Sequence, residues 1–246
     1  MYEEYTKINA FIFKLSAIFS LVAAGLILVW FISFFLLPQP DAQNSIEENI
    51  IFVANHPLEW SVGPFIMFLF TLIQVPIIVG IFSLTRRLQY FLSNLAGISG
   101  LVYFIFCSQT YFRLFTSTLR LARQFTATGN DLEKYALIAN FNGWGHLNGH
   151  SFAFNHDMLG STFLGITCIL FGVSLISSIK LRTLTGWLLL TSGFLSILGT
   201  IGYILQHKAV EMGTLVAAAF YFFSCIAMFP MFSQESQVLQ SIASKN

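Results

Sequence analysis

The sequence predicts an all-α protein, a polytopic membrane bundle of six transmembrane helices with one long outer loop that contains a short amphipathic helix. Charged residues make up only 9% of the 246 residues, whereas soluble domains average about 25%. The mean hydropathy is +0.73. Six apolar runs are each near or above the roughly 20 residues that a helix needs to cross a bilayer. These runs cover residues 10–37, 60–84, 90–115, 157–179, 184–206 and 213–232.

The chain is expected to form a single integral membrane domain, residues 1–246, because no linker rich in Pro, Gly or Ser divides it. The first apolar run far exceeds the roughly 7–15 residues of a signal-peptide core, so we expect it to remain as an anchor helix. Pro38 and Pro40 should end this helix, since proline disfavours helix at its own position and at the one before. Pro76 predicts a packing kink in the second run.

Small residues recur at helical spacing in the fourth and fifth runs. Small side chains let membrane helices approach closely, where dispersion and interhelical hydrogen bonds stabilise the pair. The sequence therefore predicts tight packing through Gly165, Gly172, Ser192, Gly193, Ser196, Gly199 and Thr200.

The long segment 116–156 is predicted to be partly helical. Polar residues share one face from residue 109 onward, so the third helix should continue beyond the membrane to about Thr126. The sequence 128–131 breaks this helix. Asn130 followed by Glu133 resembles a capping arrangement, which predicts a short helix through Asn140 that ends at Asn142-Gly143.

Basic residues predict the orientation, since loops rich in Lys and Arg are retained in the cytoplasm. Both termini should be cytoplasmic, with loops 38–59, 116–156 and 207–212 outside. Arg120, Arg123 and Lys134 lie in an outer segment under this assignment, but long loops weigh less in the rule. The cytoplasmic side would then hold Lys7, Lys14, Arg86, Arg87, Lys180, Arg182 and Lys245.

Tryptophan positions agree with these boundaries. Trp60 and Trp144 fall at predicted outer limits of the membrane, and Trp187 falls near an inner one. Because indole rings prefer the headgroup layer, these positions support the predicted limits of the membrane.

An arginine stripe is the first candidate site. Gln109, Arg113, Arg120 and Arg123 fall on one narrow face of the extended third helix. Arginines at a helix end often snorkel to lipid phosphates or pair with acidic groups, here Glu59 or Asp157. The functional interpretation is a site for an anionic lipid or solute, so membrane lipids are the predicted partners.

The histidines are the second candidate, because all five fall on the predicted outer side. His146 and His150 are spaced i, i+4, and His156 follows, so these three form the alternative prediction of a metal or haem site. Three glycines disrupt the loop around His146 and His150, and no metalloenzyme signature is present. We therefore predict no cofactor and no metal, and a surface or proton-responsive role instead.

The net charge, the cysteines and the acidic residues give no positive indication of function. A net charge of +1 gives no basic patch for nucleic acid. Cys107, Cys168 and Cys225 fall in different apolar runs and are interpreted as small buried hydrophobes. No apolar run is expected to bury an acidic residue of the kind that marks a proton or cation path.

The fourth and fifth runs resemble a bacterial family of small multi-pass membrane proteins known only as a domain of unknown function. The resemblance rests mainly on residues 157–206, with Gly165 and Gly172, a basic turn at 180–183 and a Gly202-Tyr203 exit. Thr185-Gly186 stands where Leu-Gly is usual, the turn lacks the usual proline, and segment 116–156 is longer than typical. The resemblance implies six helices and a bacterial plasma membrane, but no activity.

The leading hypothesis is a non-enzymatic integral membrane protein, either an accessory subunit or a protein that binds a lipid or small molecule. The first alternative is a membrane enzyme that uses the outer His, Asp and Glu groups. The second is a small-solute transporter whose path would be lined by Gln74, Pro76, Gln109 and Arg113.

Overall fold

The computed structural model describes residues 2–40, 44–145, 151–176 and 179–244. Within these ranges the chain is helical and contains no strand. Six helices are long and apolar enough to cross a membrane. The helices that form the spans are α1 (Tyr2–Leu36), α3 (Pro57–Thr85), α4 (Tyr90–Arg113), α7 (Phe152–Leu175), α8 (Lys180–Ile204) and α10 (Gly213–Ala243).

The six spans of the described chain form a closed ring in which each span packs mainly against two others. Each packs against the spans before and after it in sequence, and α10 returns to pack against α1. Ser236 of α10 donates a hydrogen bond to the carbonyl of Ala10, 2.9 Å away in α1. Helices that pack in a ring leave a shared interior, which is where the buried side chains of the main core lie.

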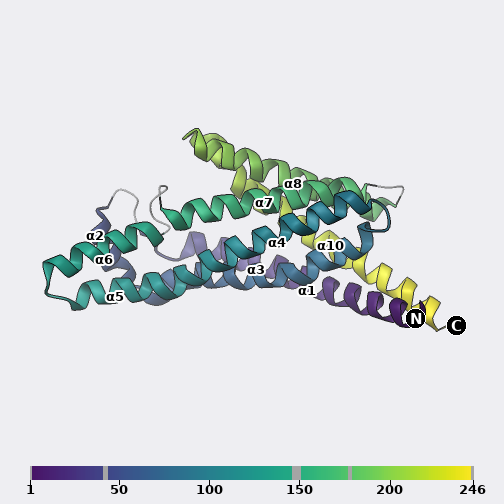
Figure 1. The fold of residues 1–246 in the computed structure, drawn as a ribbon, viewed down its shortest axis with the longest axis horizontal. Helices are drawn as coiled ribbons and strands as arrows, with labels where there is room; N and C mark the ends of the chain where they lie inside the picture. The colour runs from purple at the N-terminus through teal and green to yellow at the C-terminus, as the bar shows by residue number, and fades with distance from the viewer. Residues whose placement is uncertain (1, 41–43, 146–150, 177–178, 245–246) are drawn as a thin grey trace.

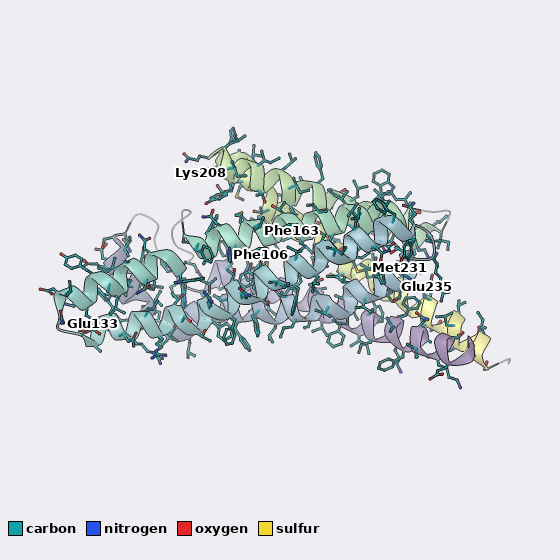
Figure 2. All side chains as sticks on the ribbon, in the orientation of Figure 1. Phe106, Glu133, Phe163, Lys208, Met231 and Glu235 are labelled. Atoms are coloured by element: carbon teal, nitrogen blue, oxygen red, sulfur yellow. The ribbon has the colours of Figure 1, made fainter. Side chains whose placement is uncertain are left out.

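The two ends of the ring differ (Figure 1). Both termini lie at one end, together with the connections α3–α4 and α7–α8, and we call it the terminal end. The opposite, distal end carries the remaining short helices, including α2 (Ile46–Asn55), α5 (Leu119–Ala127), α6 (Asp131–Trp144) and α9 (Lys208–Glu211). Figure 2 shows Glu133 at the tip of the distal end and Glu235 toward the terminal end. Arg182 pairs with Glu235 there, with Nε 3.0 Å from Oε1, and this pair joins α8 to α10.

The third span continues beyond α4, as predicted. A π-helical turn (Leu114–Thr118) joins α4 directly to α5, which ends at Ala127. The Asn130 side chain accepts hydrogen bonds from the backbone N–H groups of Leu132, at 3.0 Å, and Glu133, at 3.4 Å. This confirms the predicted N-cap of α6.

One prediction for the distal segments is wrong, and one helix there was not predicted. Helix α6 continues through Gly143 to Trp144 instead of stopping near Asn140, because its buried face packs into a distal core with Leu137 and Phe141. Loop 38–59, for which no helix was predicted, contains α2, which begins with a capping box between Ser45 and Glu48. Burial in the distal core offsets the poor helix propensity of these segments.

The predicted close contact between the fourth and fifth spans is confirmed. A Cβ atom added at Gly172 of α7 would lie 2.7 Å from the carbonyl oxygen of Gly186 in α8. The Ser196 hydroxyl donates to the carbonyl of Ser161 at 2.9 Å, and Thr162 donates to Thr200 at 3.1 Å. On its other face α7 meets α4, where the rings of Phe163 and Phe106 stack with centres 6.4 Å apart (Figure 2).

Candidate binding cavity

Two adjoining cavities occupy the distal half of the ring. The distal cavity, of about 380 Å³, lies among α1, α3 and α4 and reaches Gln39, Pro40 and Glu59 at the distal end. The central cavity, of about 240 Å³, lies deeper and reaches α8 and α10. The cavities share four lining residues: Trp30, Met67, Tyr111 and Asp157. Together they extend from the distal end toward the centre of the ring.

Asp157 lies on the wall that the two cavities share. Its residue is only 8% exposed, and the Tyr111 hydroxyl donates a hydrogen bond to Oδ1 at 2.6 Å. The Cys107 thiol lies 3.9 Å from the same oxygen. The expectation that no apolar span buries an acidic residue is therefore wrong. Helix α7 begins at Phe152, where Ser151 caps it, so Asp157 lies in its second turn rather than at its start.

The distal wall is aromatic. Trp60 is buried and its indole N–H donates to the carbonyl of Leu114, 3.2 Å away at the start of the π-helical turn. This hydrogen bond and the distal core hold the Trp60 ring inside the protein. π-Helical turns recur at functional sites, and this one borders the distal cavity through Leu114.

Three hydroxyl groups of the central cavity are bonded within the protein. Ser192 donates to the carbonyl of Ala217 at 2.9 Å, and Ser196 donates to that of Ser161. Tyr221 donates to Oε1 of Gln74, a fully buried side chain. These bonds leave a largely apolar interior in which the Asp157 carboxylate is the charged group among the described lining residues.

The predicted arginine stripe lies on the surface, away from both cavities. Arg113 is exposed and its guanidinium lies 4.1 Å from the centre of the Trp144 ring. Arg120 and Arg123 line one shallow groove on α5, with Gln124 beside them. Gln109 is exposed on α4. The structure thus brings Arg120 and Arg123 together and leaves Arg113 against an aromatic ring.

The histidines are dispersed where the structure describes them. His146 and His150 lie outside the described residues. His156 packs its ring against Phe106 and Phe152, with centres 5.0 and 3.8 Å apart. His56 lies beside Glu59, with Nδ1 3.6 Å from Oε1. Over the described ranges, no three His, Cys, Asp or Glu side chains are grouped so that they could hold a metal ion.

The residues proposed for a transport path do not converge. Gln74 is buried with Tyr221, whereas Gln109 and Arg113 are exposed, and none of the three lines either cavity. Cys107, Cys168 and Cys225 are free and buried, which confirms their interpretation as buried small residues.

A ring of six apolar helices with polar groups gathered in its interior defines a multi-pass α-helical membrane protein. The chain belongs to the family described as a domain of unknown function, DUF4386, whose model matches residues 21–239. This match confirms the resemblance and extends it over nearly all of the chain. No curated protein and no solved structure matches the sequence.

Proposed function

We propose that the protein binds a small, largely apolar molecule, which reaches the centre of the helix ring from the distal end. The observation that carries this proposal is the pair of adjoining cavities, which share Trp30, Met67, Tyr111 and Asp157. Small-molecule sites are typically concave and mostly apolar, with a few polar groups that fix orientation. The two cavities have this composition.

The side chains around the cavities favour binding over catalysis. The Tyr111 hydroxyl donates a hydrogen bond to Oδ1 of Asp157, and the hydroxyls of Ser192 and Ser196 donate to backbone carbonyls. A general base must lie within hydrogen-bonding distance of the substrate proton that it removes. A nucleophile needs a base beside it that takes its proton. The described His56–Glu59 pair lies at the mouth and His156 lies among aromatic rings, so neither is grouped with Asp157 in such an arrangement.

We also propose a bacterial plasma membrane location with the terminal end in the cytoplasm. The basic turns at Arg86-Arg87 and Lys180-Leu181-Arg182 lie at the terminal end, and basic loops favour the cytoplasm. A single cysteine placed at Gly129, between α5 and α6, should react with an impermeant maleimide added to intact cells. Labelling only after the cells are opened would show that the membrane orientation is the opposite of the proposed one.

A cavity-filling substitution tests the binding function. Gly63 of α3 lines the distal cavity, and a Cβ atom added there would meet no atom within 4 Å. Gly63→Leu should therefore grow into open space and reduce the volume available to a ligand. Gly25→Leu is the matched control, because Gly25 also meets no atom within 4 Å but lies exposed on α1. Both substitutions should raise helix propensity equally.

The probe is tert-butylbenzene, titrated by calorimetry into protein in nanodiscs, with empty nanodiscs as the blank. The wild type and Gly25→Leu should bind it with equal affinity, and Gly63→Leu should weaken binding at least about tenfold, or 1.4 kcal/mol. Equal binding by all three proteins, or no binding above the blank, would contradict the proposed function.

A further inference from the structure

We propose that the two cavities hold one unbranched alkyl chain, which enters at the distal end and leaves its polar head group there. This inference rests on the proposed binding function and names the chemical class of its ligand. It follows from three features of the cavities: their depth, the difference between their two ends and the hydrogen bonds of their walls.

The depth of the cavities matches one leaflet of a bilayer. Helices α3 and α7 both run from the distal end toward the terminal end (Figure 1). On α3 the lining extends from Glu59 to Phe70, and on α7 it extends from Asp157 to Cys168. At 1.5 Å per residue, each stretch is about 16 Å long. The hydrocarbon core of a bilayer is about 30 Å thick, so one leaflet, which is one acyl chain deep, is about 15 Å.

The two ends of the cavities differ in polarity. Gln39 and Glu59 lie at the distal mouth, where Nδ1 of His56 is 3.6 Å from Oε1 of Glu59. Phe70 and Tyr221 lie at the inner end, where their rings meet edge to face with centres 6.0 Å apart. An amphiphile suits both ends, because its head group stays among polar groups at the mouth while its chain is removed from water inside.

Hydrogen bonds within the protein already engage polar side chains of the cavity walls. Ser192, Ser196 and Tyr221 donate their protons to acceptors in the protein. Asp157 is only 8% exposed, and its Oδ1 accepts the hydrogen bond from Tyr111. A sugar or a polyalcohol would have to break such bonds or bury its own hydroxyls without partners, and either costs free energy. An alkyl chain needs no hydrogen bond and leaves all of them in place.

The test is photo-crosslinking in nanodiscs with two monomyristoyl glycerol probes. One probe carries a diazirine beside the ester, and the other carries it at the far end of the chain. The ester-side diazirine should modify Glu59 or Trp60 near the mouth, and the chain-end diazirine should modify Phe70 or Cys168, which are both buried. Leu72 is the internal control, because it lies two residues from Phe70 but is 39% exposed on the surface of α3.

Two variants test whether the chain passes through the distal cavity. Gly63→Leu should reduce the chain-end adducts at Phe70 and Cys168 about tenfold, because its side chain occupies the distal cavity. Gly25→Leu, on the exposed face of α1, should leave these adducts unchanged. Equal adducts in both variants would show that the chain does not enter from the distal end, which contradicts the proposal.

A third probe identifies the source of the chain. It is a phosphatidylcholine with the same diazirine at the end of one acyl chain. Adducts from this probe at Phe70 would support the proposal with a bilayer lipid as the ligand. Adducts at Phe70 from the monoglyceride alone would support it with a free single-chain amphiphile as the ligand.

The outcomes separate the two proposals. If tert-butylbenzene binds but the chain-end probes modify only Leu72 and other exposed residues, the cavities bind compact molecules and the alkyl-chain assignment is wrong. If tert-butylbenzene does not bind and no probe modifies a residue of the cavities, the binding function itself fails. Should Gly63→Leu fail to fold, the comparison of Phe70 with Leu72 in the wild type decides, because it requires no variant.

Discussion

The contact between α7 and α8 depends on glycine at position 172, and Gly172→Leu tests this dependence. A Cβ atom there would lie 2.7 Å from the carbonyl oxygen of Gly186 and 2.9 Å from the backbone nitrogen of Leu190. Attraction between non-bonded heavy atoms is strongest at roughly 3.5–4.0 Å, so the helices would have to separate by about 0.8 Å. Both obstructing atoms belong to the backbone, which cannot rotate away as a side chain can.

The expected decrease in the free energy of unfolding follows from two opposing contributions. Overpacking of a well-packed interior costs about 1–3 kcal/mol, and replacing a helical glycine gains somewhat under 1 kcal/mol of helix propensity. We expect Gly172→Leu to lower the free energy of unfolding by about 1–2 kcal/mol as the balance of these terms. Gly25→Leu gains the same propensity without a clash, because no atom lies within 4 Å of its added Cβ.

Unfolding by sodium dodecyl sulfate, followed by circular dichroism in mixed micelles, compares the two variants directly. Gly172→Leu should unfold at a lower detergent fraction than the wild type, and Gly25→Leu at an equal or higher one. If both variants unfold together, α7 and α8 do not approach as closely as described, and the account of the ring fails at this contact.

Two further predictions concern the distal end. Replacing Arg120 and Arg123 with Gln should weaken retention of anionic lipid by about 1 kcal/mol per charge near the membrane surface, because both side chains line one groove. Native mass spectrometry should show fewer anionic adducts, with the double replacement of Arg86 and Arg87 by Gln as the control of equal charge change. Identical adducts would refute the site. The hydrogen bond from the backbone of Ser45, and then that from its side chain, lower the pKa of Glu48 below its usual value. A carboxyl whose pKa is lowered in the folded state stabilises that state above its unfolded pKa, and the contribution is lost as the pH falls through the folded value. The protection factors of the α2 amides, which correct for intrinsic exchange, should therefore fall on acidification. Ser45→Ala should raise the Glu48 pKa in a carbon-detected NMR titration, and an unchanged pKa would contradict the capping box.

The spans were predictable because each buries or exposes apolar side chains along its whole length, so composition alone identifies it. The small residues of the fourth and fifth runs were equally informative, since Gly165, Gly172 and Ser196 do lie where α7 and α8 meet. The order of packing around the ring was not predictable. Apolar faces look alike in sequence whether they meet lipid or another helix.

The cavity residues were missed for a physical reason. Searching for apolar runs starts the fourth span at Asp157, which made this residue part of the outer rim. Ser151 directly before Phe152 is a typical N-cap signal, and it places Asp157 one turn further into the helix, where Tyr111 meets it. Tyr111 itself gave no signal, because an aromatic residue in an apolar run is expected whether or not it bonds a carboxylate. The arginine stripe was predicted as the site instead, although its side chains are exposed on the outer surface of α4 and α5.

The most direct test of the binding site locates a heavy-atom ligand. Crystals of the protein would be soaked with 1-bromo-4-tert-butylbenzene, a brominated form of the neutral probe, and the anomalous signal of bromine would be mapped at its absorption edge. We predict a bromine peak inside the cavities, within contact of Trp30 or Tyr111, which line both of them. A cavity without a peak at saturating ligand, or bromine found only on lipid-facing surfaces or in the Arg120–Arg123 groove, would contradict the account.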